Sequence, residues 1–80
     1  MSAPGWIAVI VERKQTFHII RSAEDALDLL FSNWPVVGGT TFVRAMEACA
    51  ETVTGTVTQR EAESAFLAAA MDAKVVVRIA

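Results

Sequence analysis

The spacing of the apolar residues changes twice along this chain of 80 residues, and the change constrains the fold more than any single motif. A two-residue period at both ends indicates strands, and a period of about 3.5 residues in the middle indicates amphipathic helices. We predict strands at about 6–12, 17–21 and 75–79. We predict helices at about 23–33, 41–53 and 59–73. The order β-β-α-α-α-β predicts an α+β fold, a three-stranded sheet with three helices packed on one face.

The three predicted strands can be ordered within the sheet. The first two should form an antiparallel hairpin, because the polar link between them is too short for a crossover. Alternation in the second strand places Phe17, Ile19 and Arg21 on one side of the sheet. His18 and Ile20 then lie on the other side. The last strand should pair with the first, whose continuous apolar run suits a central position.

Capping residues set the ends of the predicted helices. Ser22 is expected to cap the first helix, and Pro35 should end it, because proline disfavours helical geometry in the residue before it. A threonine of the pair Thr40-Thr41 is expected to cap the second helix. Thr58 and Glu61 match the capping box, in which each side chain accepts a backbone N–H from the other residue.

Each helix has a predicted buried face. In the first helix this face comprises Ala26, Leu27, Leu30, Phe31 and Trp34. In the second it comprises Phe42, Ala45, Met46, Cys49, Ala50 and Val53. In the third it comprises Ala62, Ala65, Phe66, Ala69 and Ala73, with Ala70 and Met71 at its margin. Together with the strands, these faces would enclose a core built largely from small side chains.

The composition excludes several classes of protein. Hydrophobic residues make up 54% of the chain, and the formal net charge of −2 comes from interleaved acidic and basic residues. Such a balance does not attract nucleic acid over long range. The apolar runs are shorter than the ~20 residues that span a bilayer, and no signal peptide is recognisable. We therefore expect a single cytoplasmic, soluble domain over residues 1–80, with no nucleic-acid or membrane partner.

Few residues offer chemistry. Cys49 is the one cysteine, so no disulfide can form within the chain, and its position predicts a buried thiol. His18 is the one histidine, and we interpret it as a surface or rim residue; the alternative, a proton carrier, lacks a nucleophile nearby in the sequence. Two carboxylate pairs lie one helical turn apart, Asp25 with Asp28 and Glu47 with Glu51. We interpret both pairs as solvated helix faces and predict no catalytic residue, no metal and no cofactor.

The connection between the first two helices contains an indole, a proline and two glycines. Gly38 and Gly39 precede a helix start, where backbone N–H groups and the helix dipole can hold an anion. If this loop binds a ligand, we expect the site to comprise Trp34, Gly38, Gly39, Thr40 and Arg44. The lysine and the spacing of a phosphate-binding loop are missing. The alternative is a tight turn forced by Pro35.

Several residues together are typical of one family. They are Asp25-Ala26-Leu27, Trp34-Pro35, Phe42, Ala45, Cys49, Gly55 and the helix Ala65–Ala70. The set resembles the small alphaproteobacterial proteins, common in rhizobia, of the domain-of-unknown-function family nine-eight-two. The resemblance spans nearly the whole chain. It implies a short, soluble bacterial domain, and it assigns no activity and no catalytic residue.

The leading functional hypothesis is a non-enzymatic protein-interaction module that self-associates, most simply as a homodimer, with an unknown protein partner as a further option. It depends on the high apolar content of a small chain and on an exposed strand edge or sheet face. The alternative is a small-ligand or anion-binding domain, enzymatic or not, that uses the Trp34–Gly39 loop and the helix start after it.

Overall fold

The elements of the protein follow the predicted order. A computed structural model describes residues 6–35 and 38–79. The elements are β1 (Val9–Arg13), β2 (Thr16–Ile20), α1 (Ala23–Ser32), α2 (Thr40–Glu51), α3 (Gln59–Asp72) and β3 (Val76–Ile79). The α+β fold with three strands and three helices is therefore confirmed.

The first strand begins at Val9, three residues later than the sequence predicts. The residues before it are held by one bond to β2 and one bond to α3 that are not part of the strand ladder. The indole Nε1 of Trp6 donates to the carbonyl of Ile20 at 3.0 Å, and the backbone N–H of Ile7 donates to Glu63 Oε2 at 3.0 Å. These two bonds divert the backbone from the ladder, which a periodic pattern cannot reveal.

The sheet has the strand order β2-β1-β3, and both pairings are antiparallel. The predicted central position of the first strand is confirmed. Val11 lies opposite His18 on one side and opposite Val77 on the other. A two-residue turn joins β1 to β2, and its residues Lys14 and Gln15 have φ values of 50° and 65°. Positive φ at both positions matches the twist of a hairpin, although asparagine and glycine adopt it more readily.

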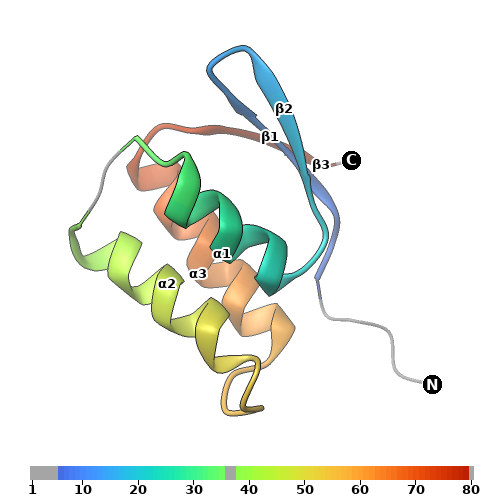
Figure 1. The fold of residues 1–80 in the computed structure, drawn as a ribbon, viewed down its shortest axis with the longest axis vertical. Helices are drawn as coiled ribbons and strands as arrows, with labels where there is room; N and C mark the ends of the chain where they lie inside the picture. The colour runs from blue at the N-terminus through green and yellow to red at the C-terminus, as the bar shows by residue number, and fades with distance from the viewer. Residues whose placement is uncertain (1–5, 36–37, 80) are drawn as a thin grey trace.

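The helices lie on one side of the sheet in two layers (Figure 1). α1 approaches β2, α3 approaches β3, and α2 packs against these two helices without approaching a strand among the described residues. The three helices therefore lie on one side of the sheet, as predicted. The sequence does not predict that α2 forms a second layer behind α1 and α3. The outer face of the sheet carries no helix in the described part of the chain.

Phe66 of α3 is the centre of the core and is fully buried. Its ring lies 5.8 Å from that of Trp6 and 5.5 Å from that of Trp34, centroid to centroid, in tilted arrangements. Tilted aromatic pairs at this distance contribute about 0.5–1.5 kcal/mol beyond their buried area. Val11 of the central strand is also fully buried, so the core joins the sheet to the helices.

The predicted buried faces are correct at their centres and wrong at their margins. Four side chains that the sequence places at or beside the core are exposed: Phe31, Ala50, Val53 and Met71. Leu29 and Glu63 are buried instead. A helical stripe in the sequence locates a face to within about one residue, and the neighbouring elements decide which side of the stripe is covered.

Two of the three predicted caps are confirmed. The Ser22 hydroxyl accepts from the backbone N–H of Asp25, and Thr58 forms the capping box with Glu61. The predicted threonine cap of α2 is wrong, because Gly39 occupies the N-cap and no side chain caps the helix there. The hydroxyl of Thr41 donates instead to Asp72 Oδ2 at 2.9 Å, which ties the start of α2 to the end of α3.

Candidate functional site

Trp34 is part of the core. Its side chain is 8% exposed and packs on Phe66 within the helix layer. Residues 36 and 37 of the Trp34–Gly39 loop lie outside the described residues. The indole is therefore occupied by packing, which supports the tight-turn interpretation of this connection.

The two glycines of the loop set the direction of α2. Gly38 and Gly39 have φ values of 98° and 89°, a region that residues with a Cβ adopt only with strain. The carbonyl of Gly39 accepts from the backbone N–H of Val43 at 3.1 Å, the first turn of the helix. Thr40 is exposed at this helix start. The backbone conformation therefore explains why glycines occupy these two positions. Anion binding by this helix start stays a prediction.

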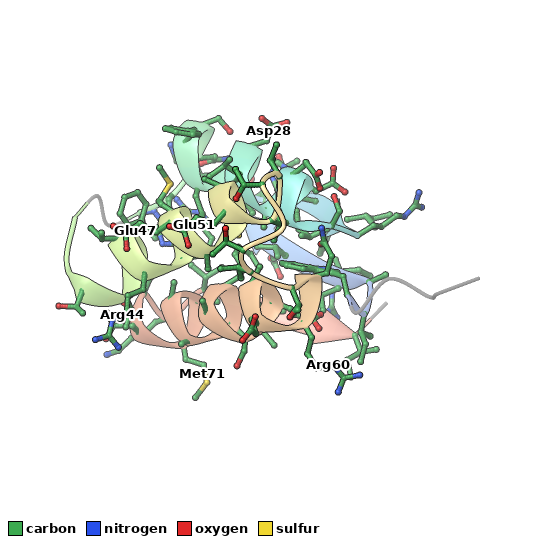
Figure 2. All side chains as sticks on the ribbon, turned by 90° about the horizontal axis from the view of Figure 1, so that it is seen from below. Asp28, Arg44, Glu47, Glu51, Arg60 and Met71 are labelled. Carbon is green, nitrogen blue, oxygen red and sulfur yellow. The ribbon has the colours of Figure 1, made fainter. Side chains whose placement is uncertain are left out.

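Arg44 and Trp34 do not line the same hollow. It projects from α2 (Figure 2) and borders a hollow of about 420 Å³ between α2 and α3. The hollow is also lined by Thr41, Glu61, Ser64, Ala65 and Ala68. Neither Trp34 nor the two glycines line it. The five residues of the predicted ligand site are therefore not gathered around this hollow, and only Arg44 borders it.

Cys49 is buried, as predicted, and free. Burial, with a smaller contribution from the nearby Glu24 carboxylate, raises the pKa of its thiol from 9.0 to about 11. A thiol with such a pKa holds almost no thiolate at neutral pH, and the thiolate is the reactive form. Cys49 therefore has the properties of a small core residue and not those of a nucleophile.

His18 lies closer to the helices than predicted. It is half-buried on the inner side of β2, and its Nε2 is enclosed with no hydrogen-bond partner in the described part of the chain. It lines a hollow of about 370 Å³ between β2 and α1, which we call the β2 hollow. The other residues that line it come from β2 and α1: Phe17, Ile19, Ile20, Asp25, Asp28, Leu29 and Ser32. Polar and acidic groups thus border this edge of the sheet.

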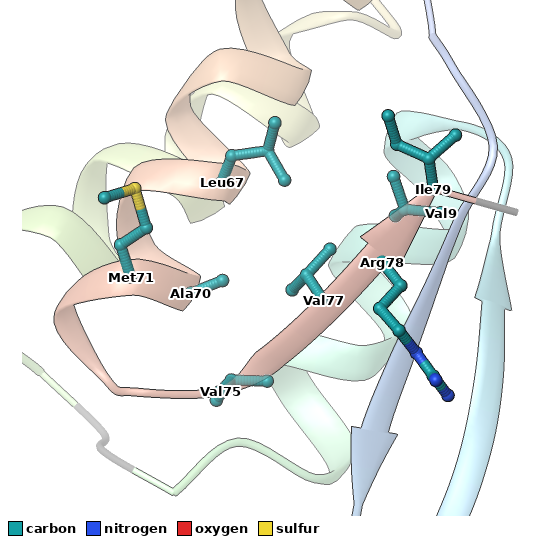
Figure 3. A pocket seen from close by; sticks show the side chains of 8 residues that line it. All are labelled: Val9, Leu67, Ala70, Met71, Val75, Val77, Arg78 and Ile79. Carbon is teal, nitrogen blue, oxygen red and sulfur yellow. The ribbon is translucent and has the colours of Figure 1, made fainter.

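A third hollow lies at the opposite edge of the sheet from the β2 hollow, between β3 and α3 (Figure 3). We call it the β3 hollow; it has a volume of about 310 Å³, and its wall is mostly apolar. It is lined by seven apolar residues and one arginine: Val9, Leu67, Ala70, Met71, Val75, Val77, Ile79 and Arg78. Within the described residues β3 pairs with β1 alone, so its other backbone edge is open.

Two large apolar side chains at the β3 hollow are exposed to solvent. Ile79 is 77% exposed and Met71 is 80% exposed. Figure 2 shows Met71 projecting from α3 away from the rest of the molecule. The sequence predicts the strand but not this surface, because a periodic pattern identifies a strand without showing that its edge is open.

The outer face of the sheet is a third exposed surface, but it mixes charge with apolar groups. Phe17, Ile19 and Val76 are about half exposed there. Glu12 of the central strand lies between Phe17 and Val76 in the register. The guanidinium of Arg78 lies over the Phe17 ring, 5.8 Å from its centroid. A charge therefore already covers part of the aromatic surface.

Over 6–35 and 38–79, no group of three or more histidine, cysteine, aspartate or glutamate side chains could hold a metal ion. No helix in these ranges combines the length and apolar content needed to cross a membrane.

Comparison with known proteins identifies the family of the chain but assigns no activity to it. Neither the curated proteins nor the solved structures include a match to it. A family model described as "Protein of unknown function (DUF982)" matches residues 7–77. This match covers most of the chain, including all six elements except the end of β3. The resemblance seen in the sequence is thereby confirmed, and the chain belongs to the DUF982 family of proteins of unknown function.

Proposed function

We propose that this protein is a non-enzymatic interaction module that self-associates through the edge formed by β3 and the β3 hollow. One observation carries the proposal: an open strand edge and an apolar hollow lie side by side. An open edge offers unpaired N–H and C=O groups to another strand, and an apolar hollow beside it offers side-chain burial.

The energetics favour this edge over the other exposed surfaces. Complete burial of a side chain such as Ile79 or Met71 contributes about 1.5–3 kcal/mol relative to leaving it exposed. Backbone pairing in the same place adds direction and register. On the outer sheet face, by contrast, contact would have to bury Glu12 or displace Arg78 from Phe17, and an unpaired buried charge is costly.

The expected dimer is weak. A standard interface buries about 800 Å² on each partner, which is roughly one sixth of the accessible surface of 5168 Å². One short strand edge and its hollow cover less than that. Interfaces below about 1,200 Å² in total are typical of transient complexes. We therefore expect monomers at low concentration and dimers as the concentration rises.

Sedimentation equilibrium over a wide concentration range tests the proposal. The wild type should approach the mass of two chains at the highest concentrations. Ile79→Glu should shift the dissociation constant upward at least tenfold, because it places a carboxylate at the rim of the β3 hollow. Ile19→Glu is the matched control: it changes an exposed isoleucine on β2 and the outer sheet face, and should leave association unchanged.

Two results would contradict the proposal. One is a mass of a single chain at every accessible concentration. The other is a dimer that Ile19→Glu weakens and Ile79→Glu does not, which would move the interface to the outer face or to β2. Both substituted residues are well exposed, so circular dichroism should show an unchanged fold and the comparison stays interpretable.

A further inference from the structure

We propose that two copies join through their β3 strands, antiparallel and centred on Val77, to form one continuous six-stranded sheet. This inference rests on the proposed self-association and specifies its geometry. The dyad would run perpendicular to the sheet at Val77, so the helices of both copies lie on the same side. Each β3 strand would then supply side chains to the hollow of its partner.

Side-chain alternation restricts the registers that two β3 strands can adopt. Val77 lies opposite Val11 and therefore on the inner face, toward the helices, together with Val75 and Ile79. Val76 and Arg78 point to the outer face. In an antiparallel pair, directly opposed residues share a face of the sheet. Inner residues must therefore oppose inner residues, which leaves only three symmetric pairings near the middle of the strand.

Charge separates these three pairings. Centring the pair on Arg78 sets two guanidinium groups directly opposite each other, and like charges in opposed positions are destabilising. Centring it on Val76 sets Lys74 opposite the Arg78 of the second copy, which again opposes two cations; Lys74 also has a φ of 58°, outside strand geometry. Centring it on Val77 avoids both conflicts.

The favoured register also fills the hollow. With Val77 opposite its own counterpart, Val75 lies opposite the Ile79 of the second copy. Val75 closes the end of the β3 hollow next to Ala70 and Met71 (Figure 3). The largely exposed Ile79 of each copy would thus be set beside the apolar end of the other hollow, where the exposed Met71 can cover it. The same symmetric contact would thus bury both exposed apolar side chains, Ile79 and Met71.

Arg78 borders the β3 hollow, but its charged group lies on the other face of the sheet. Its guanidinium lies over the Phe17 ring on the outer face. On that face the favoured register places Val76 opposite the Arg78 of the second copy, a pairing without repulsion. The β3 edge is therefore complementary to itself in side-chain size, in charge and in register, which identifies a second copy as its occupant.

Disulfide trapping tests the register. All variants carry Cys49→Ala, so that the introduced cysteine is the only thiol. Val77→Cys should form disulfide-linked dimers under mild oxidation at least tenfold faster than Val76→Cys, because only position 77 opposes itself. Cβ atoms in directly opposed positions lie about 4.5–5.5 Å apart, close to disulfide geometry.

A mixing experiment checks the register with different positions. Val75→Cys and Ile79→Cys should each cross-link slowly alone and rapidly when mixed, since position 75 opposes position 79 of the other copy. Equal rates for Val77→Cys and Val76→Cys, with no gain on mixing, would overturn the register. If sedimentation still showed dimers, self-association itself would stand; if sedimentation showed only monomers, both proposals would fall.

Discussion

The two edge strands of the sheet have the same backbone pairing, but the side chains around them differ in polarity. β2 and β3 each pair with β1 on one side, and each borders a hollow against a helix. At β2 the hollow contains Asp25, Asp28 and the half-buried His18. At β3 the residues of helix and strand that line the hollow are apolar except for Arg78, whose guanidinium lies over Phe17. Figure 2 shows Asp28 and Met71, one from each hollow, on opposite sides of the molecule.

This difference shows that an open edge alone does not define an interface. Pairing a strand onto β2 would bring a second chain against two carboxylates and an imidazole, and these polar groups would lose water. Charges beside an edge strand are a common protection against unwanted pairing. At β3, by contrast, pairing can bury apolar surface. In the proposed dimer the helix beside each edge strand therefore decides whether that strand pairs with a second chain.

The largest expected effect removes the support that both edges share. Phe66→Ala should destabilise the protein by about 3–5 kcal/mol, because a buried aromatic ring is lost and a cavity remains. Trp6, which anchors the β2 side, and Trp34 both pack on this ring. Urea unfolding followed by tryptophan fluorescence measures the loss. A change below about 1 kcal/mol would mean that the two edges are supported independently of this ring.

The sequence predicted the elements well because strand and helix periods are local properties. The capping box at Thr58 and the central β1 could likewise be derived from short segments. The surroundings of the edges could not. That Asp28 borders β2 while Met71 borders β3 depends on how α1 and α3 cross the sheet, which no local pattern encodes.

The predicted ligand site shows the same limit. In the sequence Trp34 is an unusual loop residue, but Phe66, 32 positions away, determines its environment. The burial of Glu63 could not be predicted for the same reason, because its carboxylate accepts from the distant backbone N–H of Ile7. Pairwise contacts across long sequence separations decide both cases.

The second prediction measures how firmly the β2 side is anchored. Trp6→Phe keeps an aromatic ring on Phe66 but removes the indole N–H that donates to the carbonyl of Ile20. Trp34→Phe is the matched control, since the Trp34 indole makes no hydrogen bond within the described residues. We expect Trp6→Phe to be the more destabilising by about 0.5–1.5 kcal/mol, the net contribution of one hydrogen bond. Equal losses in urea unfolding would show that this bond contributes nothing to the difference between the edges.

The third prediction compares the turns that lead into the two edge strands. Gln15 before β2 and Lys74 before β3 have φ values of 65° and 58°, where glycine fits with less strain. Lys74 ends α3 as a left-handed residue, with the N–H of Val75 donating to the carbonyl of Ala70 at 2.8 Å. Gln15→Gly and Lys74→Gly should each stabilise the protein by about 0.5–1 kcal/mol. Thermal unfolding monitored by circular dichroism measures both.

Lys74→Ala is the control for this comparison, because it removes the same charge and keeps a Cβ. It should bring no gain in stability. If Lys74→Gly stabilised the protein while Gln15→Gly did not, the edges would differ in backbone strain as well as in their flanking side chains. Equal gains would leave the chemistry of the two hollows as the difference.

The smallest expected effect concerns the charge beside β2. Asp28→Leu replaces an exposed carboxylate of the β2 hollow and should change the free energy of unfolding by less than about 0.5 kcal/mol. If carboxylates keep this edge unpaired, the variant should begin to associate through β2 as well as β3. Its weight-average mass at high concentration should then rise slightly above two chains, while the wild type stops at two.

Asp28→Asn, which removes the charge but stays polar, should show a smaller rise. A mass that stays at two chains for Asp28→Leu would assign the protection of β2 to Asp25 and His18, because these polar groups would still line the hollow.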